Sequence, residues 1–154
     1  MPRPKKAPKL RSGKKTTNTK AQYAALCYRK TGRKFEVLLI TSRGTGRWIL
    51  PKGWPMIGKT PEETAAQEAW EEAGVVGTPK DKCVGLYGYT KFEDSEKAFA
   101  CTALVYPLKV KKLEDKFPEK GQRKRGWFSP KKASKRVAEP ELARLLRNFD
   151  PRGL

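Results

Sequence analysis

The sequence predicts one α/β domain, and three observations support this prediction. Short apolar runs typical of strands occupy residues 23–50, a helix with recognisable signals at both ends covers residues 61–73, and longer strand-like runs begin at residue 83. The chain has 154 residues, a size at which one domain can bury roughly two thirds of its unfolded surface. We therefore expect residues 21–154 to form a single domain.

Three short strands are expected before the helix. Tyr23–Tyr28 and Phe35–Thr41 are strand-like runs, and the connection Arg29–Lys34 is typical of a hairpin turn because it contains a glycine between charged residues. Arg47–Leu50 predicts a third strand. Gly53–Lys59 contains glycine and proline and predicts a loop.

The helix at residues 61–73 has start and stop signals of its own. Thr60 suits the N-cap, Pro61 the first helical position and Glu63 the third position of a capping box. Gly74 suits the position just past the C-terminus, where a left-handed backbone is common.

Two longer strands are expected after the helix, at Cys83–Phe92 and Ala98–Val110. Pro107 interrupts the second strand, and since proline cannot donate a hydrogen bond to a neighbouring strand, an edge position is predicted there. Lys111–Arg125 is a charged segment with glycine and proline, and it predicts a connecting loop.

The C-terminal segment is expected to return to the sheet and to end in helices. Gly126–Phe128 predicts a short strand, and Ser129 followed by Pro130 predicts the start of a short helix. A second, amphipathic helix that stops near Pro151 is predicted by apolar residues at helical spacing: Leu142, Leu145, Leu146 and Phe149.

The charge of the chain favours a polyanionic partner. The formal net charge is +19, which suits nucleic acid, polyphosphate or a phosphorylated small molecule without choosing among them. Residues 1–20 (the basic arm) are expected to be disordered and to make at most weak contact with nucleic acid. The arm has no acidic residue, and its cations account for eight of the net charges: Arg3, Lys5, Lys6, Lys9, Arg11, Lys14, Lys15 and Lys20.

Other features of the composition exclude several kinds of chemistry. The chain has no histidine, which excludes Ser-His-Asp catalysis and histidine-bound zinc. Its three cysteines are far apart in sequence and form no closed disulfide framework, so a reducing cytoplasm is the expected location. No run of about 18 apolar residues suggests a membrane span, and the N-terminus lacks the apolar centre of a secretory signal.

The predicted helix has one acidic face. Glu68, Glu71 and Glu72 share an arc of roughly 100°, while small or apolar residues occupy the opposite side: Ala65, Ala66, Ala69, Trp70 and Ala73. Carboxylates at these spacings repel one another. The face is therefore either a solvated acidic surface or a site for a divalent cation such as magnesium, which prefers oxygen ligands.

The segment from Gly53 to Val75, GWPMIGKTPEETAAQEAWEEAGV, resembles the signature of the Nudix hydrolases. Two positions depart from that signature: Lys59 stands where the family has a glutamate, and Gln67 stands where it has an arginine. In the family, that glutamate and that arginine are thought to pair with each other. The matching positions stand in register: Gly53, Glu68, Ala69, Glu71, Glu72, Gly74 and Val75.

The resemblance implies a fold and a metal site. The fold would be an α/β/α sandwich with a mixed sheet, against which the metal-binding helix packs. Glu68, Glu71 and Glu72 would hold magnesium, or manganese in its place, with the Gly53 carbonyl as a further ligand. Glu71 or Glu72 would also accept the proton of the attacking water; the alternatives outside the helix are Glu93, Glu96 and Glu119.

The substrate would be an anionic phosphorylated small molecule. Arg47 and Lys52 flank the metal helix and are expected to bind its non-reacting phosphates. The Leu-Pro-Lys-Gly segment is similar to the corresponding segment in the branch of the family that acts on diphosphoinositol polyphosphates and diadenosine polyphosphates. Two alternatives stay open: an RNA 5′-pyrophosphohydrolase, which we rank lower, and a nucleic-acid-binding protein on a Nudix scaffold.

Overall fold

The computed structural model describes residues 19–94 and 97–154. The predicted basic arm therefore lies outside the described residues except for its last two positions, and Lys20 already begins the first strand. Among the described residues, no helix is long and apolar enough to cross a bilayer.

A mixed sheet forms the centre of the described structure. The strand order is β3-β2-β1-β7-β5, and β4, β8 and β6 add to β1, β2 and β7, respectively. β1 and β7 are parallel, whereas the other neighbours are antiparallel. The strands are β1 Lys20–Thr31, β2 Lys34–Thr41, β3 Trp48–Ile49, β4 Lys52–Gly53, β5 Val75–Pro79, β6 Gly85–Asp94, β7 Lys97–Leu113 and β8 Arg125–Phe128.

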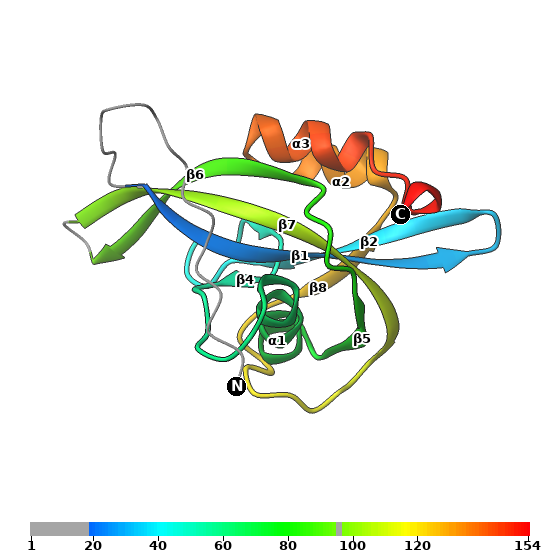
Figure 1. Cartoon of the computed structure of the whole chain (residues 1–154), viewed down its shortest axis with the longest axis horizontal. Helices are drawn as coiled ribbons and strands as arrows, with labels where there is room; N and C mark the ends of the chain where they lie inside the picture. The colour runs from blue at the N-terminus through cyan, green and yellow to red at the C-terminus, as the bar shows by residue number, and fades with distance from the viewer. Residues whose placement is uncertain (1–18, 95–96) are drawn as a thin grey trace.

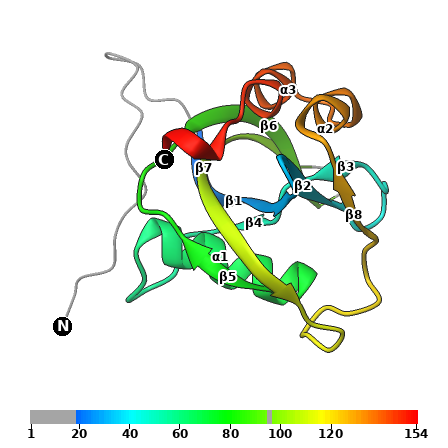
Figure 2. The ribbon, with the colours of Figure 1, turned by 90° about the vertical axis from the view of Figure 1, so that its right-hand side faces the viewer.

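Helices cover both faces of this sheet, as Figures 1 and 2 show. One face carries α1, and the opposite face carries α2 and α3 (Figure 2). The chain ends in a short 3-10 helix. The helices are α1 Pro61–Ala73, α2 Pro130–Arg136, α3 Pro140–Arg147 and η1 Pro151–Gly153. The α/β/α sandwich and the mixed sheet predicted from the sequence are confirmed.

Two apolar cores lie between these layers because side chains alternate along each strand. On β1, Tyr23, Ala25 and Cys27 join the core under α1. Their neighbours Ala24, Leu26 and Tyr28 join the core under α2 and α3. The small side chains of α1, such as Ala65 and Ala69, are fully covered. They allow this helix to lie close to the sheet.

The predicted signals place α1 correctly. The Thr60 side chain accepts a hydrogen bond from the Glu63 N–H, and the Glu63 carboxylate accepts one from the Thr60 N–H. Gly74 ends the helix in the left-handed conformation, with φ of 71°. The carboxylates of α1 are therefore held at a fixed position along the sheet.

The prediction of an edge at Pro107 is wrong. Pro107 lies within β7 and pairs with Leu26 of β1. On the other side of β7, pairing with β6 extends to Val105 and pairing with β5 begins at Leu108. Proline is tolerated here because it falls where β7 changes from one neighbour to the next.

Strand β5, at Val75–Pro79, was not expected from the sequence. It is short and includes glycine and proline, so its pattern does not resemble a strand. The Gly77 backbone lies against Lys109 of β7 so closely that a Cβ atom there would overlap the Lys109 carbonyl group. As a consequence of this pairing, β7 continues to Leu113 and shortens the expected loop.

Candidate functional site

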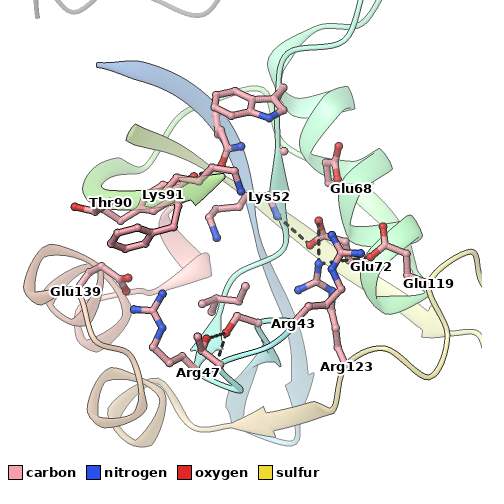
Figure 3. Close-up of a pocket in the computed structure, with 18 residues that line it drawn as sticks. Arg43, Arg47, Lys52, Glu68, Glu72, Thr90, Lys91, Glu119, Arg123 and Glu139 are labelled. Carbon is pink, nitrogen blue, oxygen red and sulfur yellow. Dashed lines mark hydrogen bonds and ion pairs between the residues drawn. The ribbon is translucent and has the colours of Figure 1, made fainter. Parts of the chain in front are cut away.

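A cleft of about 510 Å³ opens beside α1. Figure 3 shows that its walls come from α1, the β4 segment, β6, the loops next to β3 and β8, and the start of α3. Its charged lining consists of five cations and four carboxylates: Arg43, Arg47, Lys52, Lys91 and Arg123, with Glu68, Glu72, Glu119 and Glu139. The cleft can therefore hold an anion among cations while carboxylates remain available to a metal ion.

Glu68 and Glu72 lie side by side where α1 meets β4. They are one helical turn apart, so their side chains leave the same face of α1. Glu72 is 8% exposed and accepts a hydrogen bond from the Lys52 backbone N–H at 3.3 Å. Burial, together with the charge of Glu72 and a hydrogen bond to it, raises the pKa of Glu68 to about 8. The protonated form of Glu68 is therefore favoured beside Glu72.

Gly53 brings the chain backbone directly against this pair. β4 is held beside β1 by the pairing of Gly53 with Tyr23. A Cβ atom at position 53 would overlap the Glu68 carboxylate and would come within 2.7 Å of its Cγ. A side chain at position 53 would have to displace the Glu68 carboxylate from its present position, and the Gly53 backbone is close enough to contribute to the same site.

The chemistry of these groups suits magnesium. Within the described part of the chain, no three acidic or cysteine side chains gather in a cluster able to hold a metal ion. Magnesium usually keeps several waters and binds one or two carboxylates together with substrate phosphates. The pair Glu68 and Glu72 offers that number of carboxylates, and a divalent cation would relieve the repulsion between them.

Glu71, the third expected ligand, is placed differently. It is not among the residues that line the cleft, and its carboxylate accepts a hydrogen bond of 2.7 Å from the Gln67 side chain. No hydrogen bond between described residues joins Gln67 to Lys59, the other position that departs from the family signature. The glutamine therefore partners Glu71 instead.

Arg123 is a buried cation of the site that sequence reasoning missed. Its Nη2 atom lies 3.8 Å from the Glu72 carboxylate and 3.5 Å from that of Glu119. Its Nη1 atom donates a hydrogen bond to the Thr41 carbonyl at 3.1 Å. The side chain is 8% exposed. Arg123 thus connects α1 to the end of β2 and to the loop before β8, and it lowers the pKa of Glu72 against the larger opposing effect of burial.

The two predicted phosphate-binding residues both line the cleft. The Lys52 ammonium lies 4.8 Å from the centre of the Tyr89 ring, and burial lowers its pKa to about 8 while the charge of Glu72 opposes this shift. Arg47 is exposed at the opening. Its backbone is fixed by hydrogen bonds with Ser42, at 2.7 Å and 3.0 Å. In Figure 3, Lys52 lies next to the carboxylate pair, whereas the Arg47 side chain points toward Glu139 on the opposite wall.

The chain belongs to the Nudix family. Residues 19–149 match the NUDIX domain, which is most of the chain and includes both the sheet and the cleft. The resemblance inferred from Gly53–Val75 is thereby confirmed.

Individual relatives agree with this assignment. The chain is 29% identical over 119 residues to Nudix hydrolase 12, mitochondrial, of Arabidopsis thaliana, covering 75% of this chain and 59% of that protein. It is 30% identical over 130 residues to a MutT-like protein of Streptomyces ambofaciens, covering 84% and 77%. The crystal structure of C. elegans Ap4A hydrolase has the same fold, with a TM-score of 0.59 at 22% identity over 84% of this chain and 94% of that one. The chain thus spans less than two thirds of the Arabidopsis relative.

Proposed function

We propose that this protein is a magnesium-dependent pyrophosphohydrolase that cleaves a phosphoanhydride bond in an anionic small molecule. The observation that carries this proposal is the pair of half-buried Glu68 and buried Glu72 at one wall of a cleft lined by cations. Buried carboxylates with raised pKa values are typical of functional sites. The cations would bind phosphate oxygens that the reaction leaves unchanged.

Glu68 and Glu72 would hold the ion, with the Gly53 carbonyl as a further ligand. Glu71 would join them after its side chain leaves Gln67. Magnesium, or manganese in its place, neutralises phosphate charge and lowers the pKa of a bound water when it is present. Since the chain has no histidine, a carboxylate must accept the proton from the attacking water. Glu71 and Glu72 are the candidates on α1, and Glu119 is a third that lines the cleft. Of the other two alternatives, Glu93 is not among the residues that line the cleft, and Glu96 lies outside the described residues.

The proposed substrate is either nucleoside-diphosphate-linked or a diphosphoinositol polyphosphate. Both kinds carry several adjacent phosphates, which Arg47 and Lys52 would bind beside the carboxylate pair. The C. elegans structure with the same fold is that of an Ap4A hydrolase, and this agrees with a dinucleoside polyphosphate. We further propose that the protein works in a reducing compartment such as the cytoplasm, because Cys27, Cys83 and Cys101 are all free.

A panel of substrates tests this function. Dinucleoside polyphosphates, diphosphoinositol polyphosphates, ADP-ribose, nucleoside triphosphates and triphosphorylated RNA would each be incubated with and without magnesium, and phosphate or nucleotide release measured. We expect magnesium-dependent release from one of the first two classes. Release from RNA alone would favour the RNA 5′-pyrophosphohydrolase. No release from any substrate would favour the nucleic-acid-binding alternative, with the basic arm as the contact.

The raised pKa of Glu68 predicts how magnesium binding depends on pH. Because the folded state holds this proton up to about pH 8, whereas an unfolded glutamate releases it near pH 4.3, the proton stabilises the metal-free fold at low pH. That stability is lost as the pH rises to about 8. Magnesium competes with the proton, so the rise in melting temperature that it causes should be larger at about pH 8 than at about pH 6.

Thermal unfolding at several pH values, with and without magnesium, measures this effect. Lys52 does not interfere with this measurement. Its pKa is lowered to about 8, so its titration changes the stability of the fold only above that pH. Glu68→Gln should flatten much of the dependence. A magnesium effect of equal size at every pH would contradict proton competition at Glu68.

A further inference from the structure

Glu139 is a carboxylate of the cleft that has no role in the proposed hydrolysis. It precedes α3 and faces the cleft from the wall opposite Glu68 and Glu72 (Figure 3). It occupies the N-cap position of α3, yet its side chain makes no capping hydrogen bond. Its backbone carbonyl alone accepts the first helical bond, from the Ala143 N–H at 2.9 Å. The Glu139 side chain is therefore not needed to begin the helix.

The Glu139 carboxylate is partly buried and lacks a partner. Its Oε1 atom is covered by neighbouring residues and has no hydrogen-bond donor among the described residues, and no ion pair there involves Glu139. Leaving a buried acceptor unpaired is unfavourable, and most such groups in folded proteins are paired. Because Glu139 lines the cleft, a ligand bound there can bring the hydrogen-bond donor that this carboxylate lacks.

The charge of Glu139 limits which ligand can bring that donor. An ionised carboxylate only accepts hydrogen bonds, and it repels phosphate oxygens, which also only accept. A fully phosphorylated inositol ring presents phosphate oxygens on all sides. A nucleoside, in contrast, carries neutral donors next to its phosphates: the hydroxyl groups of ribose and the amino group of a base.

We infer that Glu139 is a specificity-determining residue that accepts a hydrogen bond from the nucleoside part of a nucleoside polyphosphate and disfavours densely phosphorylated inositols. This inference rests on the proposed function and selects between its two substrate classes. In this arrangement, the phosphate chain lies between the cations and the Glu68–Glu72 pair. The sugar or base then reaches the opposite wall.

A second role for Glu139 would be to balance the charge of the cleft cations. Its negative charge acts on Lys52, which lines the same cleft. Glutamine can replace Glu139 as a hydrogen-bond acceptor, but it cannot replace Glu139 in balancing charge. Glu139→Gln keeps an acceptor oxygen but loses the charge, whereas Glu139→Ala loses both, so comparing the two variants separates hydrogen bonding from charge balance.

The test measures kcat/KM of both variants on diadenosine tetraphosphate and on a diphosphoinositol polyphosphate. On the dinucleotide, we expect about a 10- to 100-fold loss for Glu139→Ala, the usual size for a hydrogen bond to a charged group, and a smaller loss for Glu139→Gln. On the inositol substrate, both variants should be at least as active as the unmodified protein. A 2′,3′-dideoxy dinucleotide then identifies the donor. If ribose supplies the hydrogen bond, Glu139→Ala should leave kcat/KM on this substrate unchanged. If the base supplies it, Glu139→Ala should still lower kcat/KM.

Glu36→Gln is the matched control, since it removes one negative charge from the β1–β2 hairpin, where Glu36 pairs with Arg29 at 2.8 Å. Equal losses on both substrates, or equal behaviour of the alanine and glutamine variants on the dinucleotide, would overturn the inference. Those results leave the hydrolase function intact. If the unmodified protein cleaves no member of the substrate panel, the proposed function itself has failed.

Discussion

Glu72→Gln is expected to lower kcat/KM by about two to four orders of magnitude, the range over which a positioned acid–base or charged group contributes to catalysis. Glu72 is the most enclosed carboxylate of the pair and contacts the Lys52 backbone and Arg123. Glutamine keeps the acceptor for the Lys52 N–H. It cannot, however, neutralise a divalent cation or accept a proton from water, so the fold should survive while turnover falls.

Steady-state kinetics on the substrate found in the panel, with thermal unfolding in parallel, checks this result. Glu62→Gln is a suitable control, because Glu62 lies in the first turn of the same helix and outside the cleft. Glu71→Gln and Glu119→Gln extend the series to the other candidate proton acceptors. Near-normal turnover of Glu72→Gln in a folded protein would rule out the proposed metal site.

Arg123→Met is expected to weaken both the fold and the activity. Removing one partner of a buried ion pair costs about 3 to 5 kcal/mol, because the other charge remains buried without its counterion. Here Glu72 and Glu119 would both lose the guanidinium, and the Thr41 carbonyl would lose a donor. The pKa of Glu72, which Arg123 lowers, would rise further and would oppose metal binding.

Urea denaturation and kcat/KM measure the two effects separately. Arg123→Lys should have stability and kcat/KM between those of the unmodified protein and Arg123→Met. Lysine retains the charge but cannot reach two carboxylates and a carbonyl at once. Arg33→Met, at an exposed position in the hairpin turn, controls for loss of a positive charge. An Arg123→Met protein with unchanged stability and turnover would contradict this account of the site.

The parts of the site that lie on α1 could be predicted because their determinants are local. Caps at Thr60 and Gly74 fix the helix, and helical spacing alone puts Glu68 and Glu72 on one face. The same spacing also includes Glu71, whose carboxylate instead turns to Gln67. That choice is made by one side-chain hydrogen bond, which a periodic pattern does not reveal.

Arg123 and Glu139 could not be predicted because their roles come from tertiary contacts. Both lie far from α1 in sequence, within segments where charged residues are frequent. What sets Arg123 apart from other cations nearby, such as Lys120 and Lys124, is the pair of carboxylates that it reaches in the folded chain. Likewise, the strand register, and not the proline pattern, decides that Pro107 lies inside β7.

The parallel pairing of β1 with β7 also governs the order in which this molecule can assemble. It joins the first strand of the described structure to the seventh, and contacts between such distant segments make folding slow because a long loop must close first. During synthesis, α1 and its carboxylates emerge well before β7, Arg123 or α3. The residues of the acidic helix are therefore synthesised early, and the opposite wall of the cleft is added only when nearly the whole domain has been translated.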